Sequence, residues 1–193
     1  MIEENGINKE YNIFSNIRKV TRQIVDYLVD NNCQDLLKLL YYGNTEPLMQ
    51  PDLTITDIQN MICKDPLLED TSKKNILFQT EIDDGFSASV SQLRIEIGDI
   101  YPINAHQGAI QINFQIVVPH KQKLIVTDVS DVDDRSVAIF QELAKIFNGT
   151  VIGNLCSPMY LDRRGMQGGT TGAFREKQNK NYSGYWATFV ALC

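Results

Sequence analysis

Acidic residues gather in one short stretch of the chain, with a spacing that approaches a metal site. Asp128, Asp131, Asp133 and Asp134 stand together, with Glu142 further on. A calcium loop takes oxygen ligands at alternate positions, a central glycine and a closing glutamate. The alternation is present, but the glycine is missing, and the glutamate falls inside a predicted helix. We therefore interpret these acids as groups that cap the helix and match its dipole, and expect no metal site.

Two further patterns approach a catalytic motif without completing it. A restriction-type nuclease core places an acid near one strand and Glu-x-Lys on the next. Asp84 and Glu96 have roughly that separation, but Gly98 stands where the lysine is needed. The run Gly168 to Thr171 lacks the lysine of a phosphate-binding loop, and no amphipathic helix follows it. We expect no enzyme here, and a small metal-dependent nuclease is the alternative from that class.

The histidines and cysteines show no catalytic or metal-binding spacing either. His106 and His120 are isolated in sequence, and no serine or cysteine elbow accompanies them. The cysteines are far apart and form no Cys-x-x-Cys pair: Cys33, Cys63, Cys156 and Cys193. This spacing predicts free thiols in a reducing compartment. The sequence thus predicts no catalytic residue, no metal ligand and no cofactor.

A glycine-rich stretch at 157–183 concentrates positive charge on an otherwise acidic chain. Its basic residues are Arg163, Arg164, Arg175, Lys177 and Lys180, against Asp162 and Glu176. Long loops of this kind are more often functional than not. It could contact an acidic partner surface or the backbone of passing DNA, or it could be a solvated loop. We assign Arg163, Arg164, Arg175 and Lys177 to partner binding.

Length and charge limit the class of protein. With 193 residues and 43% hydrophobic composition, the chain can build one sizeable core but not two ordinary domains. A net charge of −6 argues against a protein that coats DNA, because phosphate binding relies on Lys and Arg. Residues 1–9 are polar and acidic, so no signal peptide is expected, and no apolar run is long enough to span a membrane. We expect a flexible arm at 1–10, one domain at 11–193 and synthesis in the cytosol.

Hydrophobic spacing predicts a set of helices. From Tyr11 onward, one apolar stripe recurs at helical spacing through Ile13, Ile17, Val20, Ile24 and Leu28. A second, leucine-rich helix is expected at 34–42, and Thr56 with Gln59 resembles a capping box that starts a third. Residues 66–75 read as a polar linker. The long helix at 135–147 carries a stripe of Val137, Phe140, Leu143, Ala144 and Phe147, and Asn148-Gly149 ends it.

Alternating segments predict strands at 76–82, 90–97, 110–118, 150–156 and 185–192, with a loop at 98–108. The strand from Ile110 to Val118 has the clearest alternation, with apolar residues on one face. Its other face carries the uncharged Gln111, Asn113 and Gln115, which suits contact with another protein as well as with water. Consecutive strands favour antiparallel pairing. The fold class is therefore α+β: a mostly antiparallel sheet, N-terminal helices, and one long helix packed across the sheet.

Several segments are similar to virion proteins of long-tailed phages. They are Ile17 to Leu28, Leu36 to Tyr42, Gln50 to Thr54, Ser91 to Ile95, and Phe114 to His120 followed by Asp134-Arg135. The order of elements resembles the tail-terminator fold of tailed bacteriophages, which related neck and tail-completion proteins share. The resemblance covers roughly 11–156 and the last strand. The stretch at 157–183 exceeds a minimal terminator, which leaves another position in the neck open.

The resemblance implies a structural role that depends on interfaces. Terminators form rings, usually hexameric, that sit on the last layer of the tail tube, stop its growth and offer a surface to the head. Implied partners are further copies of the chain, the tail tube, possibly a sheath, and head connector proteins, while DNA passes through without sequence-specific binding. A head-side connector or closure protein is the nearest alternative. A binding module of this fold outside the virion is another.

Overall fold

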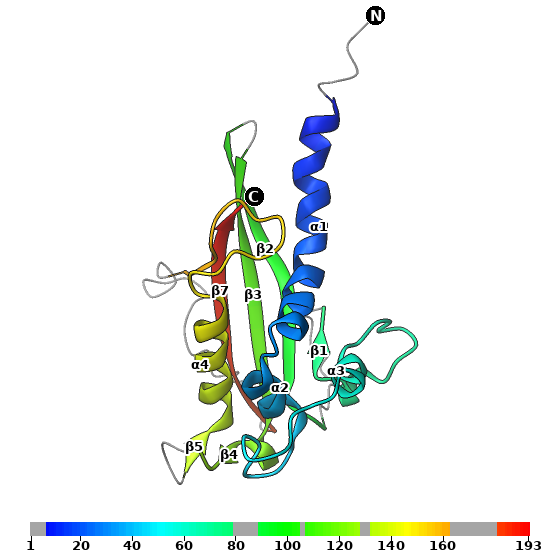
Figure 1. Ribbon diagram of the computed structural model, residues 1–193, viewed down its shortest axis with the longest axis vertical. Helices are drawn as coiled ribbons and strands as arrows, with labels where there is room; N and C mark the ends of the chain where they lie inside the picture. The colour runs from blue at the N-terminus through cyan, green and yellow to red at the C-terminus, as the bar shows by residue number, and fades with distance from the viewer. Residues whose placement is uncertain (1–6, 79–88, 105–106, 128–131, 163–180) are drawn as a thin grey trace, which may run out of the picture.

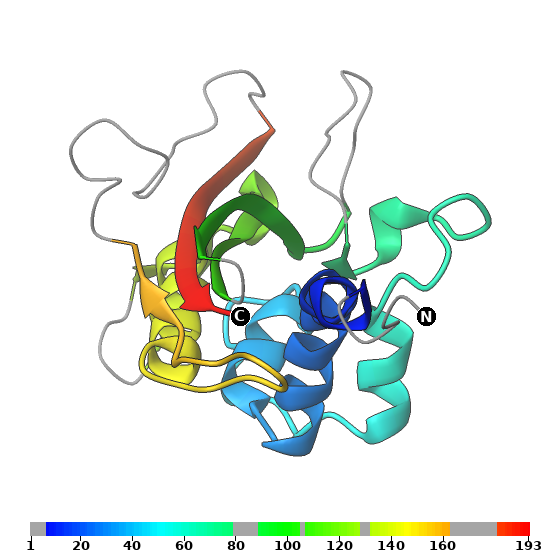
Figure 2. The same ribbon diagram turned by 90° about the horizontal axis from the view of Figure 1, so that it is seen from above.

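The fold places helices on one face of a curved sheet (Figures 1 and 2). The computed structural model describes the chain outside residues 1–6, 79–88, 105–106, 128–131 and 163–180. The helices are α1 (Ile7–Asp30), α2 (Gln34–Tyr41), α3 (Ile55–Met61) and α4 (Arg135–Phe147), with short 3-10 turns at Thr71–Lys73 and His120–Gln122. None of the helices in the described ranges is long and apolar enough to cross a membrane.

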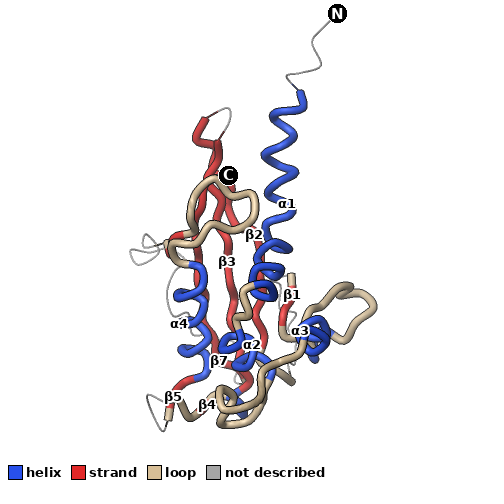
Figure 3. Tube along the Cα trace, in the orientation of Figure 1, coloured by secondary structure: helices blue, strands red, loops and turns tan. Residues whose placement is uncertain are grey.

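The main sheet has the order β1-β2-β3-β7-β6. Its strands are β1 (Ile76–Leu77), β2 (Gln92–Asn104), β3 (Gln107–Pro119), β6 (Tyr160–Leu161) and β7 (Tyr182–Leu192), and a small ladder joins β4 (Leu124–Ile125) to β5 (Asp133–Asp134). All neighbours in the main sheet are antiparallel except β1, which runs parallel to β2. The α+β class with a mostly antiparallel sheet is confirmed, and Figure 3 shows the helices against the strands.

Over the side chains that the structure describes, helix α1 has the expected apolar stripe, and Ile17, Val20, Ile24 and Leu28 are buried in the core. It begins at Ile7, four residues before the expected start at Tyr11. Asn32 ends the turn beyond it with a φ of 50°, the left-handed conformation that asparagine tolerates. The apolar stripe therefore predicted correctly which face of the helix is buried. The helix also includes part of the segment that was expected to be a flexible arm.

The predicted capping box at Thr56 and Gln59 is wrong, because α3 starts one residue after Thr54. The Thr54 hydroxyl oxygen accepts from the Asp57 backbone N–H at 3.2 Å, and the Asp57 carboxylate accepts from the Thr54 N–H at 3.0 Å. A third hydrogen bond joins the two side chains. The hydrogen bonds from the Thr54 hydroxyl and backbone lower the pKa of Asp57 below its ordinary 3.8.

Asp57→Asn is expected to lower the urea midpoint of unfolding at pH 7. Because the folded-state pKa of Asp57 is lowered, its stabilising contribution is present above pH 3.8 and is lost as the pH falls through the folded value. The urea midpoints of wild type and variant should therefore converge once the pH is below the folded-state pKa of Asp57. Urea titrations at pH 7 and near the lowered pKa measure this gap. A gap that stays constant across the range would exclude the charged carboxylate as its source.

The predicted loop at 98–108 is wrong, because β2 and β3 continue as a long hairpin that extends past the end of β7 (Figure 1). The pairing shifts register between Ile97 and Ile100, which accommodates the extra residues as a bulge. A Cβ at Gly98 would lie 2.6 Å from Asn113 Nδ2, so glycine leaves room for the Asn113 side chain there. Pro102 is tolerated because, among the described residues, β1 pairs with β2 only opposite Leu93 and Arg94, so that β2 has no outer neighbour there further along.

Two other predicted strands differ from the structure. Of the strand expected at 76–82, β1 covers Ile76–Leu77, and 79–88 lies outside the described residues. The strand expected at 150–156 is wrong: Gly153 takes a turn with φ 52°, and Thr150 makes only an isolated bridge to Met159. The strand that pairs with β7 instead follows at Tyr160–Leu161.

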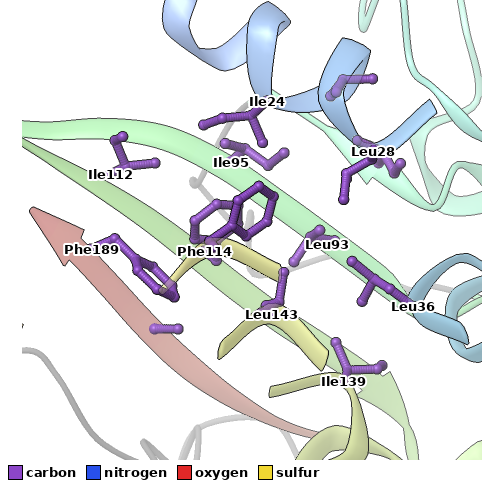
Figure 4. Packing of buried hydrophobic residues seen from close by; sticks show 14 of the residues in the cluster. Ile24, Leu28, Leu36, Leu93, Ile95, Ile112, Phe114, Ile139, Leu143 and Phe189 are labelled. Atoms are coloured by element: carbon purple, nitrogen blue, oxygen red, sulfur yellow. The ribbon is translucent and has the colours of Figure 1, made fainter. Parts of the chain in front are cut away.

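The core lies between the sheet and helices α1, α2 and α4 (Figure 4). Phe114 on β3 stacks on Phe147 of α4 with ring centroids 5.1 Å apart, and its edge meets Phe189 of β7 at 5.5 Å. The helix at 135–147 has the predicted bounds, but its buried face is centred on Ile139, Leu143 and Phe147. The expected stripe members Val137 and Phe140 are only partly buried.

A buried arginine at the start of α4 joins separate segments of the chain. Arg135 is fully buried and donates only to backbone carbonyl oxygens in its hydrogen bonds within the described chain. Its Nε donates to Gln122 at 2.7 Å and its Nη1 to Leu39 at 2.8 Å. Further bonds reach the carbonyl oxygens of Tyr42 and Asn44. The arginine thereby caps the end of α2 and fixes the loop that follows it.

Candidate assembly surfaces

Asn113, on the polar face of β3, takes part in hydrogen bonds across the sheet, on the face opposite the helices. Asn113 is half-buried, and its Nδ2 donates to Glu96 Oε1 on β2 at 3.0 Å. Thr188 on β7 donates its hydroxyl to Asn113 Oδ1 at 2.8 Å. Glu96, considered above as a nuclease acid, thus accepts from an amide in this network. The face is less neutral than β3 alone suggests, because β2 contributes charges to it.

Gln115 lies deeper on the same face, between Arg94 of β2 and Trp186 of β7. Its side chain is 3% exposed, and its Oε1 has no hydrogen-bond partner within the described chain. Arg94 is also buried and donates from Nη2 to Gln92 Oε1 at 3.0 Å. Of the three predicted contact residues on β3, Gln111 and Asn113 therefore keep part of their surface, and Gln115 does not.

The other predicted site residues lie outside the described residues: Arg163, Arg164, Arg175 and Lys177, as well as Asp84, His106 and the run 168–171. Their assignments stay predictions. Asp134 has the capping role expected of it, since its carboxylate accepts from the Ser136 N–H at 2.9 Å and pairs with Lys123 at 3.3 Å. No group of three or more potential metal ligands occurs in the described ranges.

A pair of adjacent leucines forms the most exposed apolar feature of the described surface. Leu67 is 93% exposed and Leu68 is 85% exposed, on the turn 64–69 between α3 and β1, which we call the leucine turn. Sequence reasoning treated this segment as polar linker and missed it. The only sequence signal was the presence of two leucines within a charged stretch, since exposure depends on the tertiary fold.

Hydrogen bonds hold the leucine turn in one conformation. The Asp65 carboxylate accepts from the Leu67 N–H at 2.9 Å, and Glu69 Oε1 accepts from the N–H groups of Lys64 and Asp65 at 3.0 and 3.1 Å. Glu69 also pairs with Lys74 at 2.6 Å, and the hydrogen bond from that lysine, with the backbone donors, lowers the pKa of Glu69. The leucines are therefore presented by an ordered turn, which reduces the entropy lost on binding.

A small apolar hollow lies beside the leucine turn. Its lining residues are Cys63, Lys64, Pro66, Leu77 and Phe78, and its volume is about 130 Å³. Phe78 at its rim is 39% exposed. Projecting leucines next to a hollow of side-chain size form the kind of surface that anchors protein contacts.

The β2–β3 hairpin carries a second exposed apolar group at its outer end, formed by Ile100, Tyr101 and Ile103. These residues lie where β2 has no neighbour on its outer side within the described residues. Together the leucine turn and the hairpin give the molecule two apolar surfaces that its own core does not use. Neither surface contains a set of groups arranged for catalysis.

Comparison with known proteins identifies a family. The YomW family model matches residues 34–190, which takes in α2 to α4 and nearly all of the main sheet. No curated protein matches significantly, and no solved structure does. The chain thus belongs to the YomW family, a phage-type protein family.

Proposed function

We propose that this YomW-family protein is a structural component of the phage head–tail junction, most specifically a tail-terminator or tail-completion subunit. Copies of the chain form a ring on the end of the tail tube and join it to the head. The observation that carries this proposal is the leucine turn with its neighbouring hollow. Two leucines on an ordered turn leave apolar surface in contact with water, which is unfavourable for a protein that acts alone. In a protein that assembles, the same surface can be buried against a neighbouring subunit.

In the proposed ring, the leucine turn of one subunit packs against an apolar surface of the next. Such head-to-tail contacts close into a ring when the rotation that relates neighbouring subunits divides a full circle into a whole number of equal steps. The α+β fold and the phage-type family support this assignment, and the resemblance to terminators suggests six copies. The ring contacts the tail tube, possibly a sheath, and head connector proteins, and DNA passes through it without sequence-specific binding. This role needs no catalysis and no cofactor.

A head-side connector or closure protein is the second candidate. The specific observation in its favour is the basic, glycine-rich stretch at 157–183, which a minimal terminator lacks. Both candidates place the protein in the virion. They differ in whether the chain remains with isolated tails or with isolated heads when particles are separated.

The double change Leu67→Asp with Leu68→Asp is expected to abolish assembly and leave the fold intact. Both side chains are almost fully exposed in the single chain, so charges cost little there, but charges buried in an apolar contact cost several kcal/mol. Incorporation into particles should fall at least tenfold, which corresponds to a loss of about 1.4 kcal/mol or more. Quantitative mass spectrometry of purified virions measures incorporation, and circular dichroism checks the fold.

Val132→Asp serves as the matched control, because Val132 is an exposed apolar residue next to β5, away from the leucine turn. It should enter particles at the wild-type level. Wild-type incorporation of the double variant would refute the leucine turn as a contact. Absence of the wild-type chain from purified particles would refute the structural role itself.

A further inference from the structure

Two cysteines that are distant in sequence meet at the end of β7. The backbone N–H of Cys156 donates to the carbonyl oxygen of Leu192 at 2.7 Å, and the Leu192 N–H donates to the Ser157 hydroxyl at 2.8 Å. These bonds fasten the segment before β6 to the residue that directly precedes Cys193. The two cysteines therefore occupy adjacent positions in space.

Their surroundings differ in a way that matters for reactivity. Cys156 is exposed, whereas Cys193 is buried and its Sγ lies 3.4 Å from the Gly108 carbonyl oxygen. Burial raises the pKa of the Cys193 thiol, and the nearby Cys156 raises it further, so the two sulfurs are within electrostatic reach of each other. Cys156 is thus the thiol that a reagent in solution meets first.

The hydrogen bond from Cys156 brings its backbone next to that of Cys193. The Leu192 carbonyl group that accepts this bond is joined directly to the backbone nitrogen of Cys193. Bridged cysteines have Cα atoms about 4.4–6.8 Å apart, a separation that one hydrogen bond beside a shared peptide group allows. A rotation of the exposed Cys156 side chain and a small shift of its segment are what the bridge requires.

We propose that Cys156 and Cys193 form a redox-sensitive staple, which is open as two thiols and closes as a disulfide in the presence of a small-molecule disulfide such as oxidised glutathione. The Cys156 thiolate attacks one sulfur of the reagent, forms a mixed disulfide and releases one glutathione thiolate. The Cys193 thiolate then attacks the Cys156 sulfur and releases the second. The two protein thiols lose two electrons and two protons, one S–S bond forms, and the reagent is reduced to two glutathione molecules.

Closure joins the segment before β6 to the end of β7 and encloses all the residues between them in one covalent loop. A link across a loop of this length stabilises the folded chain mainly by restricting the unfolded one. A virion protein is made in a reducing cytosol and later leaves it, so the staple would close after assembly. This timing rests on the proposed function, whereas the bridge itself does not.

The test is oxidation of the purified full-length chain with oxidised glutathione, followed by proteolysis and mass spectrometry. We expect a peptide in which Cys156 is linked to Cys193, two hydrogens lighter than the reduced pair, within a single chain. Cys33 and Cys63 should stay unlinked to each other and to this pair. The thermal midpoint should rise by several degrees and return to its starting value after dithiothreitol is added.

Two conservative variants make the result decisive. Cys193→Ser should stop at the mixed disulfide of Cys156 with glutathione, and Cys156→Ser should leave Cys193 as a thiol. A wild-type chain that stops at the mixed disulfide, or that links either cysteine to another chain, would overturn the staple. Absence of the protein from virions would remove only the proposed timing, because the intramolecular bridge is measured on the isolated chain.

Discussion

Replacing Arg135 with methionine is expected to lower the free energy of unfolding by at least about 3 kcal/mol. The guanidinium group is fully buried. It donates hydrogen bonds to carbonyl oxygens in the 3-10 turn His120–Gln122, at the end of α2 and in the loop that follows α2. Methionine fills a similar volume but leaves these buried acceptors without a donor. Each orphaned buried acceptor costs about 1–3 kcal/mol.

One effect opposes this loss. Burial lowers the pKa of Arg135 from its ordinary value to about 10, so the folded protein bears a free-energy cost for keeping the cation out of water. The side chain is nevertheless charged at pH 7, and methionine would remove that cost along with the hydrogen bonds. We expect the loss of the hydrogen bonds to outweigh the relief of the burial cost, because Arg135 donates to several carbonyl groups at once. Some of these carbonyl groups lie at the end of α2, where the helix dipole favours a cation.

Urea unfolding followed by circular dichroism measures the change, and Arg22→Met is the matched control. Arg22 pairs with Asp26 on the exposed surface of α1 at 2.9 Å, and exposed pairs of this kind contribute well under about 1 kcal/mol. The control should therefore unfold close to the wild-type midpoint. Equal effects of the two substitutions would show that the Arg135 hydrogen bonds stabilise no more than a surface ion pair does.

The second large effect is expected from Gly184→Ala, which should destabilise the fold by about 3 kcal/mol through overpacking. A Cβ at Gly184 would lie only 2.0 Å from the backbone oxygen of Ile116 on the neighbouring strand. Backbone cannot rotate away as a side chain can, so β7 and β3 must separate at the position where Gly184 pairs with Val117. The substitution therefore weakens the central pairing of the sheet.

Gly108→Ala provides the comparison for this position, because it adds the same methyl group to another strand of the same sheet. Its Cβ would lie 3.4 Å from the Tyr101 oxygen and 3.7 Å from the Cys193 sulfur, which are ordinary or nearly ordinary contacts. The expected change in unfolding free energy is within about 0.5 kcal/mol. Thermal unfolding of both variants measures the difference, and similar midpoints would contradict the clash at Gly184.

Local patterns were sufficient for the elements that have strong signals of their own. Alternation from Ile110 to Val118 predicted the central strand, and the acidic cap before Arg135 together with Asn148-Gly149 predicted both bounds of α4. Other features depend on partners distant in sequence. The hairpin runs through Gly98 and Pro102 because of how β2 pairs with β3, and no short-range pattern reports that pairing.

The candidate site was less accessible to sequence reasoning than the fold. Leu67 and Leu68 are apolar residues of a kind normally expected in a core, and only the hydrogen-bonded turn around them leaves them exposed. Gln115 showed the reverse: a polar residue on the outward face of its strand is buried next to Arg94. In both cases the surroundings decide exposure: a local hydrogen-bonded turn in the case of the leucines, and a neighbouring strand in the case of Gln115.

The hydrogen bonds that Arg135 donates to distant carbonyl groups also affect when the protein can fold during its synthesis. Its hydrogen bonds to Leu39 and Asn44 cross 96 and 91 residues of sequence. During synthesis, the end of α2 therefore leaves the ribosome long before its donor is made. Contacts of such long range slow folding, because the intervening chain must be ordered first. We therefore expect the end of α2 to reach its final packing only after α4 is made, and a chain that ends before Arg135 to remain incompletely folded.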